Sequence, residues 1–164
     1  MKFLLLLPVF CLVFALPVSA RVGETEAECV ARYGKATKET AQPGGNKISL
    51  FRKSAFDIKA VFDQGKAVSV TYSRTPKAAG SGAISPSEQQ TLMRVNGGKK
   101  EWKTLEPTKA DDKYETIDGK MRARYNRGKK YLEVYDTAWN KTLTKLKAED
   151  KKVRSDLSRD LRGL

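Results

Sequence analysis

The stretch Ile58-Lys-Ala-Val-Phe-Asp-Gln-Gly-Lys-Ala-Val-Ser-Val-Thr-Tyr72 has a counterpart 63 positions further on, Met121-Arg-Ala-Arg-Tyr-Asn-Arg-Gly-Lys-Lys-Tyr-Leu-Glu-Val-Tyr135. The two align without gaps, with Ala, an aromatic residue, Gly and Lys at matching positions. Each divides at a three-residue turn, Asp63-Gln-Gly65 or Asn126-Arg-Gly128, which is typical of a β-hairpin. The constant offset predicts an internal duplication.

A short helix is expected before each hairpin. The stretches Thr25-Glu-Ala-Glu28 and Ser85-Pro-Ser-Glu88 are both capping boxes, in which a hydroxyl and a glutamate satisfy free helical amides. Glycines end the two helices, and Gly34 and Gly97 lie at the same offset of 63 positions. The duplication therefore extends from the hairpins back to the helices.

The predicted fold class is α+β. It has two tandem units, each one helix plus a three-stranded antiparallel meander, packed as one core, with a C-terminal amphipathic helix. A strand around Lys47–Lys53, matched around Lys113–Ile117, completes each meander. Apolar residues spaced by threes and fours from Trp139 to Leu161 predict that the last helix docks onto the domain, with a break near 148–152. The chain is divided into a signal peptide (1–20), repeat unit 1 (21–74), a linker (75–84), repeat unit 2 (85–136) and a charged C-terminal helix (137–164).

The first 20 residues have the features of a secretory signal peptide. Met1-Lys2 is a basic start, 3–16 is almost wholly apolar, and Val18-Ser-Ala20 offers small residues for cleavage. We therefore expect export and cleavage near Ala20, with Arg21 as the first residue of a mature chain in the periplasm or the extracellular space. No later apolar run approaches the roughly 20 residues of a membrane-spanning helix.

Composition excludes several kinds of catalytic site. The chain has 32 Lys and Arg against 19 Asp and Glu, a net charge of +13, and no histidine. A Ser-His-Asp triad, a Cys-His pair and a histidine-ligated metal are therefore excluded. Cys29 is the single cysteine outside the signal peptide, and we interpret it as a small buried hydrophobe. The sequence predicts no catalytic residue, no metal and no cofactor.

The opening helix, Gly23-Glu-Thr-Glu-Ala-Glu-Cys-Val-Ala-Arg-Tyr-Gly34, resembles that of the small periplasmic SmpA/OmlA-type proteins, which serve outer-membrane assembly. The shared pattern is Gly-x-Thr, then apolar positions at Cys29 and Tyr33, then Gly. The hairpin with Gly65-Lys-Ala-Val68 is also similar to that family. Tandem copies of such a unit resemble the β-lactamase inhibitor protein-like fold. The chain departs from the family at Ala36, where proline is common, and at its predicted mature start, which has no cysteine for a lipid.

A basic cluster distinguishes the second hairpin from the first. Val61 and Gln64 of the first copy correspond to Arg124 and Arg127 of the second, so the second hairpin has gained positive charge. Aromatic side chains follow directly after these basic residues. The candidate binding face consists of Arg122, Arg124, Arg127, Lys129, Lys130, Tyr131 and Tyr135.

Acidic residues lie just upstream of this cluster, where a meander places the adjacent strand. They are Asp111, Asp112, Glu115 and Asp118. We expect them to pair with the arginines across the strands, at a few tenths to about 1 kcal/mol per pair. Such pairing would cancel the local field on which attraction of a polyanion depends.

The predicted function is that of an exported, non-enzymatic binding protein that recognises a protein partner through the exposed sheet face. The alternative is binding of an anionic polymer, such as a glycan, lipid head groups or nucleic acid, through the basic second hairpin. Ordinary solvating charge also accounts for the cluster, since the basic surplus is spread along the mature chain. An enzyme is the class that the sequence supports least, because no nucleophile, base and oxyanion site come together.

Overall fold

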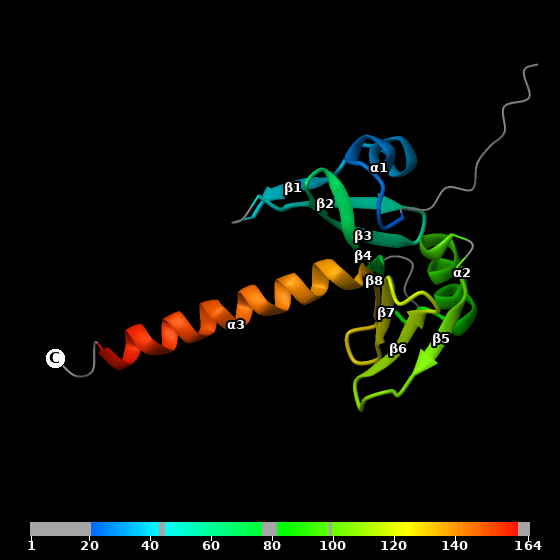
Figure 1. Cartoon of the computed structure of the whole chain (residues 1–164). Helices are drawn as coiled ribbons and strands as arrows, with labels where there is room; N and C mark the ends of the chain where they lie inside the picture. The colour runs from blue at the N-terminus through cyan, green and yellow to red at the C-terminus, as the bar shows by residue number, and fades with distance from the viewer. Residues whose placement is uncertain (1–20, 43–44, 77–81, 99, 161–164) are drawn as a thin grey trace, which may run out of the picture.

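The computed structural model describes residues 21–42, 45–76, 82–98 and 100–160 and shows one eight-stranded antiparallel sheet with three helices (Figure 1). The predicted signal peptide and its cleavage site lie outside the described residues, as does the middle of the predicted linker. The strand order across the sheet is β1-β2-β3-β4-β8-β7-β6-β5. The elements are α1 (Glu26–Tyr33), β1 (Lys38–Ala41), β2 (Lys47–Lys53), β3 (Phe56–Asp63), β4 (Lys66–Arg74), α2 (Pro86–Gly97), β5 (Trp102–Leu105), β6 (Asp111–Thr116), β7 (Met121–Asn126), β8 (Tyr131–Asp136) and α3 (Thr137–Asp160).

The predicted fold of two helix-plus-three-strand units is wrong. Strands β4 and β8 pair with each other, with Val70 opposite Val134, so both halves of the chain share a single sheet. Each half also contributes four strands rather than three. The additional strands, β1 and β5, lie at the two edges, and all four side chains of β1 are exposed. A strand with no buried side chain lacks the alternation of apolar and polar residues by which strands are recognised.

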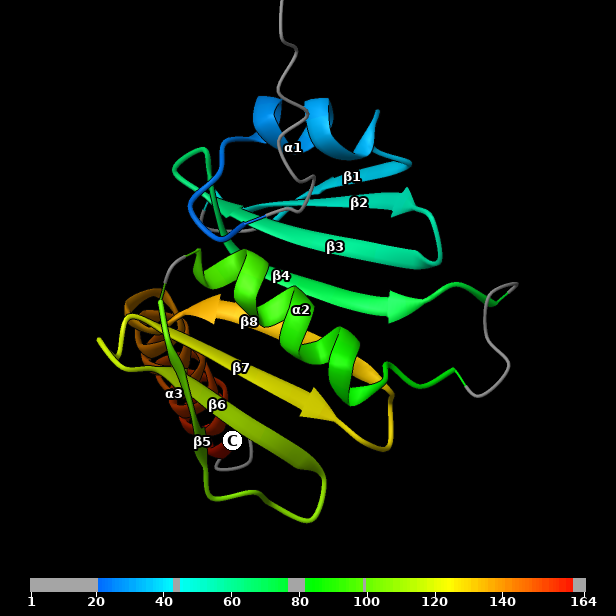
Figure 2. The same ribbon diagram turned by 90° about the vertical axis from the view of Figure 1, so that its right-hand side faces the viewer.

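Helices α1 and α2 begin and end as their sequences predict. Thr25 and Ser85 are the N-caps, and each forms a complete capping box with the glutamate three residues later. The chain leaves α1 at Gly34 and α2 at Gly98, with φ of 86° and 62°, a backbone region that glycine tolerates best. Both helices lie on the same face of the sheet (Figure 2).

One hydrophobic core fills the space between these helices and the sheet. Along β3 and β7 every second side chain is buried, which places one face of the sheet against the helices. Tyr33 of α1 packs on Phe51 of β2, with ring centroids 5.4 Å apart. The core residues are Cys29, Tyr33, Phe51, Ile58, Ala60, Phe62, Ala67, Val70, Tyr72, Ile84, Met93, Met121, Ala123, Tyr125, Leu132 and Val134.

The offset of 63 positions holds for the first strand of each hairpin and fails for the second. The buried positions of β3 match those of β7. Tyr72 of β4 is 2 % exposed in the core, whereas its predicted counterpart Tyr135 follows the buried Val134 and so lies on the opposite face. A bulge between Val61 and Phe62 and a longer turn in the second hairpin shift the register. The alignment of the two tyrosines is therefore wrong, and the duplication stays a prediction.

Helix α3 projects from the other side of the sheet (Figures 1 and 2). It contacts β8 of the sheet, and Leu146 is 57 % exposed, so among its described side chains the helix packs on the domain only near its start. The predicted break near 148–152 is absent, since the helix runs without interruption from Thr137 to Asp160. Over the described ranges, none of the helices combines the length and the apolar character needed to cross a membrane.

Gly97 of α2 is in contact with an indole ring, and replacing it by Ala is expected to destabilise the fold. A Cβ at this position would lie 2.7 Å from Trp102 Nε1 and 3.2 Å from Cε2. Overpacking of this kind costs about 1–3 kcal/mol, against about 1 kcal/mol of helix propensity that Ala gains over Gly. Urea unfolding followed by tryptophan emission should show a lower midpoint and a shifted native spectrum.

Gly128→Ala is the matched control, because its Cβ would meet nothing nearer than Asn126 Oδ1 at 3.7 Å. The φ angle of Gly128 is also not positive. Equal loss of stability in the two variants would contradict the packing argument.

Candidate functional site

The face of the sheet opposite α1 and α2 carries a groove of about 660 Å³, lined by the side chains of β3 and β7 that alternate with the buried ones. The groove crosses five consecutive strands, β2, β3, β4, β8 and β7, and therefore both halves of the chain. Its lining residues are Thr37, Leu50, Phe51, Arg52, Asp57, Ile58, Lys59, Thr71, Ser73, Arg124, Lys129, Tyr131 and Glu133. We call this feature the sheet groove.

The structure brings three of the seven predicted site residues into the sheet groove, namely Arg124, Lys129 and Tyr131. Arg122 and Tyr135 are opposite each other on β7 and β8, outside the groove lining. The remaining two, Arg127 and Lys130, are in the turn between these strands. The rest of the lining comes mostly from the first half, which sequence reasoning missed because it did not foresee the pairing of β4 with β8.

Two of the predicted cross-strand ion pairs are present. Arg122 Nε lies 2.8 Å from Glu115 Oε1, and Arg127 Nη1 lies 2.7 Å from Asp112 Oδ1. The other carboxylate oxygen of Glu115, Oε2, lies 3.1 Å from Lys103 Nζ. Hydrogen bonds from Arg122 and Lys103 hold the pKa of the Glu115 carboxyl below its usual range. The prediction that acids of the adjacent strand partly cancel this positive charge is confirmed for Arg122 and Arg127.

Arg124 pairs with a different acid from those predicted. Its Nε donates to Glu133 Oε2 at 2.8 Å, and Ser69 Oγ donates to the other carboxylate oxygen of Glu133 at 3.1 Å. Its guanidinium carbon lies 6.0 Å from the centroid of the Tyr131 ring. Burial disfavours the charged form of Arg124, but the nearby Glu133 and Tyr131 outweigh it and raise its pKa. Arg124 is therefore held in place as a fixed charge at the groove.

Two lysines and one hydroxyl of the sheet groove lack such partners among the described residues. Lys59 and Lys129 form no ion pair with any residue in the described ranges. The Oγ1 atom of Thr71 is buried, and no described residue bonds to it. Arg52, by contrast, lies 2.7 Å from Asp57. The groove thus offers two ammonium groups to a ligand, while the Thr71 hydroxyl lies buried beneath it.

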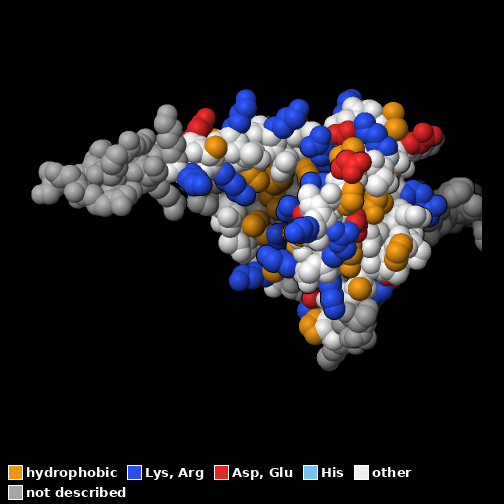
Figure 3. Space-filling model, turned by 90° about the horizontal axis from the view of Figure 1, so that it is seen from below, with side chains coloured by type: hydrophobic (Ala, Val, Ile, Leu, Met, Phe, Trp, Pro, Cys, Tyr) orange, Lys and Arg blue, Asp and Glu red, His pale blue; other side chains and the backbone are white. Residues whose placement is uncertain are grey.

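The molecular surface mixes charge with apolar area. Figure 3 shows Lys and Arg side chains spread over the body with hydrophobic side chains between them, and further hydrophobic side chains in the angle between the body and α3. Acidic side chains are fewer in this view.

Cys29 is a free thiol in the core, as its sequence context predicts. Its side chain has 0 % exposure, and burial raises its pKa to about 12. The thiolate that nucleophilic chemistry requires is therefore scarce at neutral pH. The described part of the chain contains no cluster of three or more His, Cys, Asp or Glu residues that could hold a metal ion.

No protein-family model and no curated protein sequence matches the chain. Among solved structures, it is similar to a cysteine-rich secretory protein from Staphylococcus aureus, with a TM-score of 0.42 and 11 % identity over 72 % of this chain and 45 % of that one. It is also similar to an extracellular protein containing an SCP domain from Bacillus anthracis, with a TM-score of 0.40 and 11 % identity over 71 % of this chain and 44 % of that one. The chain spans less than half the length of both structures. The resemblance to SmpA/OmlA-type and β-lactamase inhibitor-like proteins stays a prediction.

Proposed function

We propose that this protein is exported and acts as a non-enzymatic binding protein, which holds a protein partner on the open face of its sheet. The observation that carries the proposal is the sheet groove, about 660 Å³ in volume and built from five adjacent strands. Its lining combines apolar side chains, among them Leu50 and Tyr131, with four basic and two acidic ones. A site on strands is more rigid than a site on loops, which favours specific recognition.

The ion pairs on this face favour a protein over a simple polyanion. Arg122, Arg124 and Arg127 each lie within 2.8 Å of a carboxylate oxygen, so much of their charge is neutralised within the molecule. Attraction of a polyanion depends on uncompensated charge, whereas a protein interface uses a polar rim around an apolar centre. We expect the partner to present carboxylates to Lys59 and Lys129 around an apolar side chain.

An anionic polymer is the second candidate, and the two unpaired lysines of the groove are the observation in its favour. The two candidates differ in their dependence on salt, since binding of a polyanion weakens steeply as counterions are added. An enzymatic role has less support, because the chain has no histidine and its buried thiol has a pKa of about 12.

Blocking the groove is expected to weaken partner binding. Thr71→Arg places a long charged side chain on β4, the middle one of the five strands that line the groove. Capture from the secreted and envelope fractions of the source organism should yield one protein that stays bound to the mature chain at high salt. Its affinity should fall at least about tenfold in the variant, which corresponds to about 1.4 kcal/mol.

The double variant with Lys59→Ser and Lys129→Ser separates the candidates. A protein partner should lose only part of its affinity, whereas an anionic polymer such as heparin should dissociate from this variant and, at high salt, from the wild type too. Lys109→Ser, on an exposed loop outside the groove, serves as the control. Binding of the captured protein to Thr71→Arg with unchanged affinity would contradict the proposal.

A further inference from the structure

Main-chain hydrogen bonds hold the first described residues against strand β4 of the sheet. Gly23 N donates to Ala67 O at 2.6 Å, and Ala67 N donates to Glu24 O at 2.7 Å. Thr25 forms an isolated antiparallel bridge with Lys66 at the start of β4. The segment that leads into α1 is therefore held in one position beside the core.

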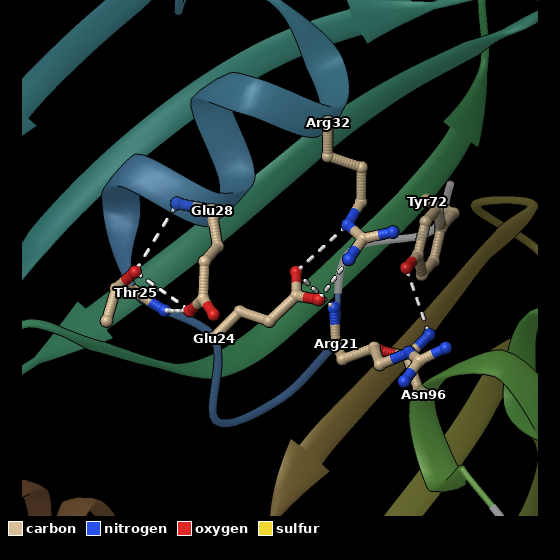
Figure 4. Close-up of polar contacts among 7 residues, drawn as sticks. All are labelled: Arg21, Glu24, Thr25, Glu28, Arg32, Tyr72 and Asn96. Carbon is tan, nitrogen blue, oxygen red and sulfur yellow. Dashed lines mark hydrogen bonds and ion pairs between the residues drawn. The ribbon is translucent and has the colours of Figure 1, made fainter. Parts of the chain in front are cut away.

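The carboxylate of Glu24 is the polar centre of this segment (Figure 4). Arg32 of α1 approaches it with two nitrogens, Nη2 at 2.5 Å from Oε1 and Nε at 3.2 Å from Oε2. The main-chain nitrogen of Arg21 donates to the same Oε2 at 3.2 Å. The side chains of Arg32 and Glu24 are only 18 % and 12 % exposed. Charges this poorly exposed are weakly screened by salt.

Three further titratable groups lie around the pair of Glu24 and Arg32: the Cys29 thiol, the Tyr72 phenol and the carboxylate of Glu28. Burial raises the pKa of the Cys29 thiol to about 12, and burial likewise raises the pKa of the Tyr72 phenol to about 12. The charges around the Arg21 nitrogen are therefore the carboxylates of Glu24 and Glu28 and the guanidinium groups of Arg32 and Arg21 (Figure 4). Glu28 is engaged by Thr25, whose main-chain nitrogen donates to it at 2.7 Å, so Glu24 is the carboxylate in contact with the Arg21 nitrogen.

We propose that Glu24 is the binding site of the α-ammonium group that signal-peptide removal creates at Arg21. The proposal rests on the export and the cleavage after Ala20 that the sequence predicts. In the uncleaved chain the Arg21 nitrogen is an uncharged amide with one hydrogen. An endopeptidase of the export pathway would hydrolyse the Ala20–Arg21 bond with one water, leaving a carboxylate on Ala20 and an amine on Arg21. This amine takes up a proton at neutral pH, since α-amino groups have a pKa of about 7.7–8.0.

Cleavage thus turns a neutral hydrogen bond into an ion pair at the same atom. Charge-assisted hydrogen bonds are about twice as strong as neutral ones. The guanidinium of Arg32 shares the carboxylate and opposes part of this gain, but the ammonium lies directly on an oxygen of Glu24. The mature protein is therefore more stable than its precursor, and processing completes the structure around α1.

The α-amino group of the mature protein, beginning at Arg21, should show a raised pKa. We expect it about one unit above the ordinary range, because an opposite charge within about 4–6 Å shifts a pKa by about 1–3 units and Arg32 keeps the shift at the lower end. The pH dependence of reductive methylation of the amine, followed by NMR, measures it. Glu24→Gln should return the pKa to the ordinary range, whereas Glu106→Gln, on an exposed loop, should leave it raised.

A chain with Ala20 retained before Arg21 restores the amide and provides the stability test. It should melt a few degrees below the mature chain at neutral pH, and the difference should vanish in the Glu24→Gln background. Since the folded-state pKa is raised, the added stability is present below about pH 7.7 and is lost as pH rises through the raised value. Equal losses in both backgrounds, or an unshifted amine pKa, would overturn the proposal. An exported protein that begins elsewhere would overturn it too, while a failed partner capture would bear only on the groove.

Discussion

Replacing Val134 by Asp is expected to unfold both halves of the sheet together. Val134 is 0 % exposed at the centre of β8, opposite Val70 of β4 and Ala123 of β7. An unpaired carboxylate there costs several kcal/mol, which is comparable with the total stability of about 5–15 kcal/mol of a small domain. Because the core runs without a break across the β4–β8 junction, damage on one side removes the support of the other.

Amide hydrogen exchange measures this outcome strand by strand. Protection should fall in β2 and β3 of the first half as much as in β6 and β7 of the second. Thr104→Asp is the matched control, since Thr104 lies exposed on the edge strand β5 and should accept the same side chain with little effect. A first half that kept its protection in the Val134→Asp variant would show that the two halves fold independently.

Replacing Phe51 by Ala is expected to lower the free energy of unfolding by about 3–5 kcal/mol. Phe51 is 1 % exposed, lies opposite Ile58 in the sheet and packs on the ring of Tyr33. Its ring thus joins β2 to α1, a helix of eight residues that is too short to be stable alone. The variant should therefore lose the ordered packing of α1 before the rest of the sheet melts.

Urea unfolding gives the loss in free energy, and near-UV circular dichroism of the tyrosines reports the loosening of α1. Val30→Ala on the same helix is the control, because Val30 is 37 % exposed and loses little contact. A loss below about 1 kcal/mol for Phe51→Ala would mean that the neighbouring side chains close the cavity, contrary to expectation.

Local sequence signals predicted most of the individual elements. The capping residues Thr25 and Ser85 located the starts of both short helices, and alternation in 56–62 located β3. These features depend on contacts within a few residues, which the sequence displays directly. The edge strand β1, Lys-Glu-Thr-Ala, was missed because it buries no side chain and is ordered only by its partner β2.

The candidate site was predicted only in part, for a related reason. Charge gained in the second hairpin pointed to Arg124 and Lys129, which do line the sheet groove. Lys59 and Thr71 were missed, since nothing in the first half alone marks them as functional. They belong to the same surface because β4 lies beside β8, two strands about 60 residues apart in the chain.

The sequence by itself therefore determined where α1 and α2 begin and end, which hairpins form and which side of β3 is buried. Only the tertiary structure decided that β4 joins β8 in one continuous sheet, and that Tyr72 and Tyr135 face opposite sides of it. The physical reason is that caps and turns are satisfied by neighbouring residues, whereas the edge of a strand accepts any strand that offers matching hydrogen bonds. A single bulge between Val61 and Phe62 then shifts the register, and a shift of one residue moves every later side chain to the other face.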